Sequence, residues 1–159
     1  MIIMLTMINL FTSLDNIETN NIFFQTPIKN TVIDNSLFIR IIYSTKDLVL
    51  NGIFMMVPLK ICFVEKSYNK YKCSYNIGEN QNIISQIIAL EKSILQKLNI
   101  QNKIMRFKIS DQLKLGFIKL FSNEAMKETN VIVLKISGVW ENEMEYGLTY
   151  KFSSIIRQF

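Results

Sequence analysis

The sequence predicts a mostly β, α+β protein, namely an OB-like small β-barrel with one inserted amphipathic helix. Six or seven stretches have the composition or the two-residue period of strands, and one stretch between them has the period of a helix. The chain of 159 residues has the length of one ordinary domain, and its hydrophobic content of 49% is enough for a core. We therefore expect residues 1–159 to form a single OB-like domain with an irregular lead-in over residues 1–36.

The stretch from Val131 to Phe152 is predicted to form two strands joined by an acidic turn. The first strand is apolar on both faces and is therefore expected at the centre of the sheet, with Val131, Val133 and Val139 on one face and Ile132, Leu134, Ile136 and Trp140 on the other. The second strand is expected to be half-exposed, because Leu148, Tyr150 and Phe152 alternate with Thr149, Lys151 and Ser153. Aromatic side chains with a lysine close by make this strand the first place to look for function.

The first half of the chain contains a polar lead-in and at least three predicted strands. Residues 1–11 are apolar, have neither the basic flank nor the cleavage site of a signal peptide, and are expected to pack on the domain. Residues 37–44 form a strand in which Arg40 is the one charge. Two further strands follow at about 48–57 and 59–65, with a turn or bulge at Asn51-Gly52 and a break at Pro58.

The second half begins with a segment of lysines and tyrosines over residues 65–78, for which two interpretations stay open: a loop that contacts nucleic acid, or a solvated loop with partly buried tyrosines. Residues 80–99 have apolar side chains every three or four positions and predict an amphipathic helix that covers the sheet. Residues 105–110 and 113–121 alternate and predict a hairpin with a cationic outer face, and a polar connection follows at 122–130.

Enzyme chemistry has little support in the composition. The chain has no histidine, which removes the usual general base and the commonest zinc ligand. Cys62 and Cys73 match no metal or redox motif and are expected to be reduced thiols in a reducing, intracellular compartment. The acidic turn offers Glu141, Glu143 and Glu145 as a metal or acid/base cluster, although carboxylates two residues apart in a turn more often face water. We therefore expect a protein that is not an enzyme and uses no cofactor or metal.

A formal net charge of +5 allows a polyanionic partner without requiring one. Aromatic and basic residues on several predicted strands could bind single-stranded nucleic acid, the aromatics by stacking on bases and the basic groups by contacting phosphates. The candidate residues are Arg40, Tyr43, Arg106, Lys108, Lys114, Trp140, Tyr150 and Lys151. The alternative is that the aromatics are core residues and the lysines only the wet face of the sheet, in a structural or interaction protein that presents an apolar patch or an edge strand.

Two segments resemble a known family. The runs from Lys29 to Met55 and from Lys135 to Phe152 resemble parts of the single-stranded DNA-binding proteins of nucleocytoplasmic large DNA viruses, which have an OB fold and are related to those of certain tailed phages. The resemblance implies a viral protein that coats single-stranded DNA during replication or repair, in the cytoplasmic viral factory or the nucleus of the host. It leaves open self-association and contacts with replication proteins, and it implies no membrane contact. The last residues given, SSIIRQF, have the terminal aromatic residue of the phage-like tail, Phe159, but none of its acidic residues, so we do not expect recruitment of replication partners through such a tail.

Overall fold

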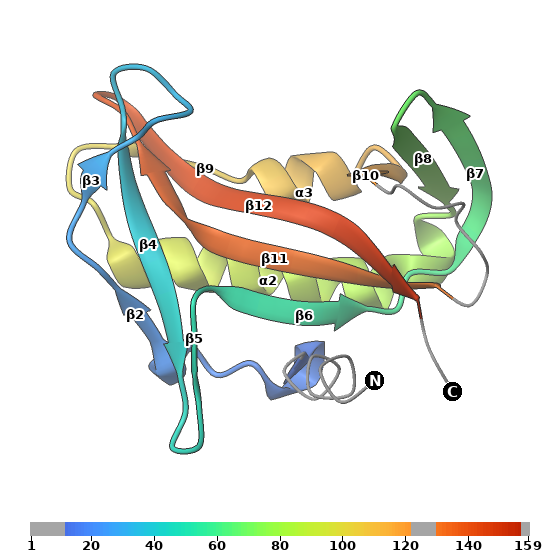
Figure 1. Ribbon diagram of the computed structural model, residues 1–159, viewed down its shortest axis with the longest axis horizontal. Coiled ribbons are helices and arrows are strands. Elements are labelled where there is room, and N and C mark those ends of the chain that lie inside the picture. Colours follow the sequence, from blue (N-terminus) through green and yellow to red (C-terminus); the bar gives the residue numbers. More distant parts are fainter. Residues whose placement is uncertain (1–11, 122–129, 157–159) are drawn as a thin grey trace.

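The computed structural model describes residues 12–121 and 130–156, which form a mostly β, α+β fold with one curled, mixed sheet and one long helix behind it (Figure 1). The strands are β1 (Thr12–Ser13), β2 (Ile22–Phe24), β3 (Ile28–Lys29), β4 (Leu37–Ser44), β5 (Val49–Leu50), β6 (Ile53–Val57), β7 (Ile61–Ser67), β8 (Lys70–Tyr75), β9 (Ile104–Arg106), β10 (Phe117–Phe121), β11 (Asn130–Glu141) and β12 (Glu145–Ile156). The helices are α2 (Gln81–Leu98) and α3 (Lys108–Leu113), with 3-10 turns at Leu14–Asn16, Thr19–Asn21 and Gly78–Asn80.

The sheet runs in the order β1-β6-β11-β12-β10-β8-β7, and β4 continues it beside the last residues of β11. Most neighbours are antiparallel, whereas β1 and β6, β10 and β12, and β9 and β12 run parallel. Among the described residues, the two end strands of this path, β1 and β7, do not pair with each other. The α+β prediction is therefore confirmed, but the sheet curls around α2 as an open half-barrel and does not close into the predicted barrel.

The helix α2 confirms the predicted amphipathic helix to within one residue at each end. Its buried apolar side chains, Ile84, Ile87, Ile94 and Leu95, recur at helical spacing and pack into the core against the sheet. The helix ends at Leu98. The following Asn99 still donates its N–H to the Leu95 carbonyl, and its left-handed backbone (φ 44°) then turns the chain away from the helix. One face of the sheet is thus closed by α2.

A β-bulge in β11 changes which residues face α2. Ile132, Leu134 and Ile136 are buried on the α2 side, and the pairing with β12 shifts between Ile136 and Gly138. The extra residue reverses the alternation, because two residues of the bulged strand then oppose one residue of its partner. Val139 therefore joins the α2 side and Trp140 lies on the opposite side, so the predicted assignment of these two residues to faces is wrong.

The predicted hairpin over residues 105–121 is also wrong. Its first half forms only the short strand β9 and then the helix α3, while β10 pairs with β8 and β12. The buried carboxylate of Glu91 on α2 accepts hydrogen bonds from the N–H groups of Ile109 and Ser110, at 3.0 and 2.8 Å, and from the Ser110 hydroxyl. Glu91 thereby supplies acceptors for the free amides of the first turn of α3. In most helices the N-cap residue, directly before the first turn, has this role.

The lysine- and tyrosine-rich segment at 65–78 is mainly strand, so the predicted loop is wrong, whereas the predicted burial of tyrosines is confirmed for Tyr71 and Tyr75. β7 and β8 form an antiparallel hairpin whose turn follows Ser67. Tyr71 and Tyr75 are buried, and the Tyr75 hydroxyl donates to the Leu113 carbonyl at 2.8 Å. Burial raises the pKa of Tyr75 to about 12. The predicted turn at Gly52 (φ 112°) and the break at Pro58 are confirmed, whereas residues 1–11 and almost all of the predicted connection at 122–130 lie outside the described residues.

Candidate nucleic-acid interface

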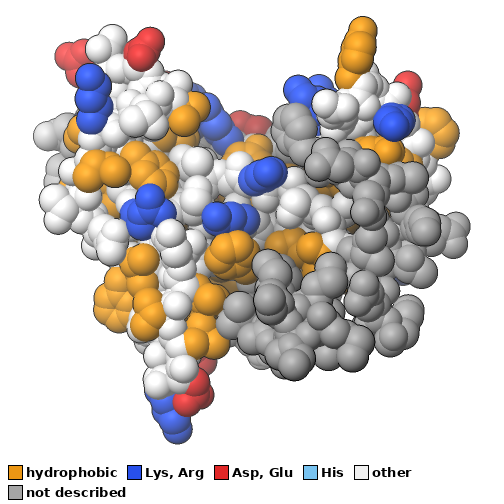
Figure 2. Space-filling model, in the orientation of Figure 1, with side chains coloured by type: hydrophobic (Ala, Val, Ile, Leu, Met, Phe, Trp, Pro, Cys, Tyr) orange, Lys and Arg blue, Asp and Glu red, His pale blue; other side chains and the backbone are white. Residues whose placement is uncertain are grey.

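The face of the sheet opposite α2 carries basic side chains drawn from five strands. We call it the basic-aromatic face and define it by Phe38, Arg40, Phe54, Lys72, Phe117, Lys119, Lys135 and Lys151. Figure 2 views the molecule from this side and shows Lys and Arg side chains grouped over the middle of the face, with apolar side chains beside them. The face thus combines positive charge with aromatic rings.

The pairing register fixes the central part of this face. Lys135 of β11 lies directly opposite Lys151 of β12 on one side and Phe54 of β6 on the other. Arg40 of β4 lies opposite Gly138, farther along β11. Residues directly opposite each other in a sheet share a face, so these side chains project from the same side. Their neighbours in sequence, such as Leu134 and Phe152, are buried on the α2 side.

The same register extends the face to the far strands. Phe121 of β10 lies opposite Ser153 of β12, two residues after Lys151, so Lys119 and Phe117 continue the face along β10. Lys119 in turn lies opposite Lys72 of β8. The residues between them, Ile118 and Leu120, are fully buried on the other side. The positive charge therefore extends across the sheet from β4 to β8.

Each aromatic ring that defines the face has a cation over it. The distances from cation to ring centroid are 5.7 Å for Arg40 and Phe38, 5.1 Å for Lys135 and Phe54, 4.5 Å for Lys72 and Phe117, and 6.0 Å for Lys119 and Phe117. Such contacts contribute only about 0.5–1 kcal/mol each at exposed sites. A ligand that brings its own ring and negative charge can therefore displace the cation from the ring at little cost.

Two glycines allow aromatic rings to approach the backbone closely on this side of the sheet. A Cβ at Gly138 would lie 2.6 Å from the Phe38 ring, and a Cβ at Gly147 would lie 2.9 Å from the Trp140 ring. Both positions also meet backbone oxygens of neighbouring strands, so the chain has no room there to move aside. The glycines permit the close approach of ring and backbone, as glycine in a strand often does.

The turn between β11 and β12 is bordered by a second group of cations. The ammonium of Lys108 lies 4.5 Å from the centroid of Trp140, which is only 5% exposed. Arg106 forms an ion pair with Glu145. The hydrogen bond and charge of Glu145 raise the pKa of Arg106, and those of Arg106 lower the pKa of Glu145. Trp140 is thus covered, and Arg106 is already neutralised by a carboxylate.

The predicted site residues divide into four groups. Arg40 and Lys151 belong to the basic-aromatic face, and Arg106, Lys108 and Trp140 lie beside it near the turn. Lys114 is exposed at the end of α3. Tyr43 and Tyr150 require correction, because both lie on the other side of the sheet.

The two tyrosines are packed against other parts of the protein. Tyr43 is 4% exposed, and its hydroxyl accepts a hydrogen bond from the Glu18 N–H at 3.2 Å. Tyr150 is half-buried on the α2 side, and its hydroxyl lies 3.4 Å from the Lys108 carbonyl, to which it donates. Burial raises the pKa of the Tyr150 phenol, with smaller contributions from the charges of Glu91 and Asp111. Neither ring is available to stack on a ligand at the open face.

Sequence reasoning missed the centre of the face. Lys135 is the only charge within the long apolar run of β11, and it could have been found by the argument that selected Arg40. Phe54, Phe117 and Lys119 lie in strands that were predicted, but only the register shows that they share a face with Lys151. Lys72 lies in a segment that was expected to be a loop.

The acidic turn is neutralised by the chain itself. Lys103 forms an ion pair with Glu141 and donates to the Asn142 carbonyl at 2.8 Å, while Arg106 pairs with Glu145. Glu143 is exposed. Among residues 12–121 and 130–156, no three Cys, Asp or Glu side chains gather as a metal site would need.

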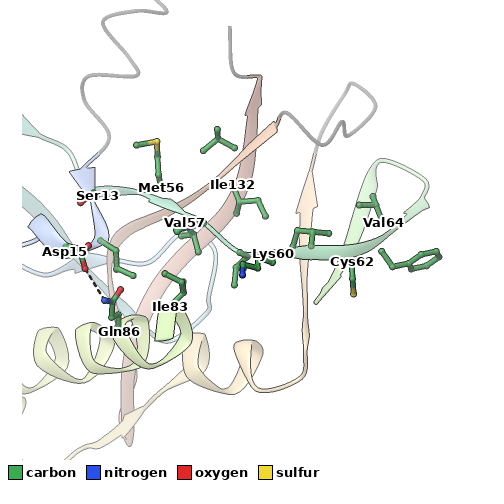
Figure 3. Close-up of a pocket in the computed structure, with 16 residues that line it drawn as sticks. Ser13, Asp15, Met56, Val57, Lys60, Cys62, Val64, Ile83, Gln86 and Ile132 are labelled. Atoms are coloured by element: carbon green, nitrogen blue, oxygen red, sulfur yellow. Dashed lines mark hydrogen bonds between the residues drawn. The ribbon is translucent and has the colours of Figure 1, made fainter. Parts of the chain in front are cut away.

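A separate cleft of about 880 Å³ lies where β6 and β7 meet the start of α2 (Figure 3). Its lining is mainly apolar and includes Met56, Leu59, Ile83 and Val131. At one end, the Gln86 amide donates to the Asp15 carboxylate at 3.0 Å. Of the described residues that line the cleft, Asp15 and Lys60 are the charged ones, and the larger part of the lining surface is apolar, so the cleft offers mainly apolar contact.

Comparisons with known proteins identify no relative: no family model, curated protein or solved structure matches this chain. In the part of the chain that the structure describes, no helix has the length and apolar character needed to cross a membrane. Cys62 and Cys73 are free thiols, Cys62 exposed and Cys73 buried, and burial raises the pKa of Cys73. The functional argument therefore depends on the geometry of the site.

Proposed function

We propose that this protein binds single-stranded DNA across the basic-aromatic face without preference for a base sequence. The main observation is that Arg40, Lys72, Lys119, Lys135 and Lys151 share one face with three aromatic rings. Lysine and arginine contact phosphates regardless of sequence, and any base can stack on an aromatic ring. A single strand exposes both its phosphates and its bases, whereas a duplex hides the faces of its bases.

The preference for DNA and the role in coating single strands during viral replication or repair come from the resemblance of Lys29–Met55 and Lys135–Phe152 to viral single-stranded DNA-binding proteins. We also propose that the open sheet is a relative of the OB barrel, because OB barrels bind single strands on a strand face. The proposal is non-enzymatic and needs no cofactor.

The test compares two double variants that lose the same charge. Lys135→Ala/Lys151→Ala removes the central pair of the face, and Lys46→Ala/Lys92→Ala removes two exposed lysines from a turn and from α2. Binding of a fluorescent oligo(dT) is followed by anisotropy at several salt concentrations. We expect the first variant to bind about tenfold more weakly or worse, with a salt slope reduced by about 0.7 for each lost phosphate contact. Equal effects of the two variants would contradict the proposal.

A duplex and an oligo(rU) serve as further ligands in the same assay. Binding of the duplex as tight as that of oligo(dT) would exclude a stacking site, and tighter binding of oligo(rU) would replace DNA by RNA as the ligand. Trp140 fluorescence is a poor probe here, because its ring is covered by Lys108.

A second candidate is a structural or protein-interaction role. It is favoured by β7, whose residues are exposed along nearly the whole strand and include the apolar Phe63 and Val64. An exposed edge strand can pair with a strand of another chain. This role predicts that substitutions in β7, rather than on the basic-aromatic face, abolish function.

A further inference from the structure

β7 is the last strand of the sheet path, and no described strand pairs with its outer edge. Six of its seven residues are exposed, among them Phe63 at 61% and Val64 at 40%. In Figure 1 the β7–β8 hairpin stands at one end of the sheet. The edge therefore presents unpaired backbone groups together with apolar side chains, which is the arrangement that favours pairing with another strand.

We propose that β7 pairs with β7 of a second copy of this chain, antiparallel about a two-fold axis that passes through Val64. Such an axis is perpendicular to the sheet, so equivalent side chains of the two copies project from the same side of the joined sheet. The residue at the axis lies directly opposite the same residue of the second copy. Val64 is the middle residue of β7, so this register overlaps the whole strand. It places Val64 opposite Val64, Phe63 opposite Glu65, Cys62 opposite Lys66 and Ile61 opposite Ser67 of the second copy.

The charges of β7 disfavour the registers centred on Glu65 and Lys66, and the bulge next to Cys62 disfavours the one centred on Phe63, which would set Cys62 opposite Val64 in a central pair. An axis through Glu65 would place two carboxylates directly opposite each other, and an axis through Lys66 would do the same with two ammonium groups; like charges in that position are destabilising. With the axis at Val64, two apolar side chains meet at the centre and Glu65 lies beside the Phe63 ring. The bulge of β7, next to Cys62, leaves the three central pairs regular.

The perpendicular axis has a consequence for the rest of the molecule. Both copies would present their basic-aromatic faces on the same side of one continuous sheet, with Lys72 of each copy near the junction. A single strand of nucleic acid could then pass from one copy to the next. This last step rests on the proposed function, whereas the pairing of β7 does not.

The test uses engineered cysteines in the full chain, with Cys62→Ser as background and the buried Cys73 retained. Residues directly opposite across antiparallel strands have Cα atoms about 4.5–5.5 Å apart, within the range of a disulfide. Val64→Cys is therefore expected to form a covalent dimer under mild oxidation. Phe63→Cys alone is the matched control, because the two cysteines of such a dimer would lie two residues out of register. A mixture of the Phe63→Cys and Glu65→Cys variants should cross-link, because residue 63 of one copy lies opposite residue 65 of the other. Light scattering of the unmodified chain over a range of concentrations gives the mass, which should rise to that of two chains.

Two variants, each tested for mass and for binding of oligo(dT), separate the possible results. Val64→Lys sets two lysines against each other at the axis and should shift the chain to a monomer, with the affinity of each chain for a short oligo(dT) unchanged. A monomer at all concentrations, or cross-linking of Phe63→Cys as fast as that of Val64→Cys, would overturn the pairing. Loss of DNA binding by Lys135→Ala/Lys151→Ala without change in mass would leave the pairing intact and concern the proposed function alone.

Discussion

The two faces of the central sheet differ in what holds their side chains in place. On the α2 side, Leu134 and Phe152 are buried among apolar neighbours. On the opposite side, Lys135 and Lys151 lie one residue away in sequence, and Lys135 lies over the ring of Phe54. Burial of apolar area accounts for most folding stability, so the first face maintains the fold. The basic side chains of the second face contribute less to stability than the buried apolar ones do.

The largest effect should separate the two faces at neighbouring positions of β11. Leu134→Ala removes a fully buried side chain and leaves a cavity, so we expect the free energy of unfolding to fall by about 4 kcal/mol. Lys135→Ala, one residue away, should change it by less than about 0.5 kcal/mol. Urea denaturation followed by circular dichroism measures both. A loss of several kcal/mol in Lys135→Ala would mean that the open face also maintains the fold.

A somewhat smaller loss is expected at Glu91, whose carboxylate is buried on the α2 side. Glu91→Ala leaves the N–H groups of Ile109 and Ser110 and the Ser110 hydroxyl without their acceptor, which should cost about 3 kcal/mol of unfolding free energy. Glu91→Gln keeps one carbonyl oxygen and should cost less. Glu79→Ala, at an exposed carboxylate before α2, is the control. Equal denaturation midpoints for Glu91→Ala and Glu79→Ala would refute the capping role.

The third prediction concerns stacking on the open face. Phe54→Leu keeps an apolar side chain at a half-buried position but removes the ring, so oligo(dT) binding should weaken by about 1–2 kcal/mol, or roughly tenfold. Phe54→Trp retains a ring and should bind at least as well as the unmodified chain. Both variants should keep their melting temperature within a few degrees. Equal affinity of the Leu and Trp variants would exclude stacking at this position.

The smallest effect is expected at the exposed ion pair beside the turn. The hydrogen bond from Arg106 lowers the pKa of Glu145, so the pair stabilises the folded state above the ordinary glutamate pKa of about 4.3 and loses this contribution as the pH falls through the lowered value. The stability difference between the unmodified chain and Glu145→Gln should therefore be present at pH 7 and vanish near pH 2. Glu143→Gln, at an exposed carboxylate, should show no such pH dependence.

The elements with long and regular patterns could be predicted from the sequence. The period of α2 and the alternation in β4 and β12 gave their positions to within one or a few residues, because many side chains report the same period. The segment of α3 was predicted as a strand, because Phe107 and Ile109 alternate with polar residues. Its helix is short, and the acceptor for its first amides comes from Glu91, 18 residues away from Ile109 in the chain. No local pattern contains that information.

The candidate site could be predicted only in part, for a similar reason. Alternation placed Arg40 and Lys151 on an open face, but adjacent residues of a strand point to opposite sides, so Tyr150 could not share that face with Lys151. Regular alternation along β11 would place Trp140 on the α2 side with Ile136, but the bulge between Ile136 and Gly138 places it on the opposite side. Gly138 is the one residue in the sequence that hints at this bulge. Which strands lie next to one another, and hence Phe54, Lys119 and Lys72, depends on long-range pairing.

The contact of Glu91 with α3 also bears on how the molecule opens. The carboxylate sits on α2 but holds the amides of Ile109 and Ser110, so those amides can exchange with solvent only if α3 detaches from α2 or both come away together. Tyr75, whose hydroxyl bonds to Leu113, ties the other end of α3 to β8. Short helices usually exchange their amide hydrogens quickly, by local fraying. In this protein the six residues of α3 should exchange as slowly as the buried amides of α2, as members of one cooperative unit.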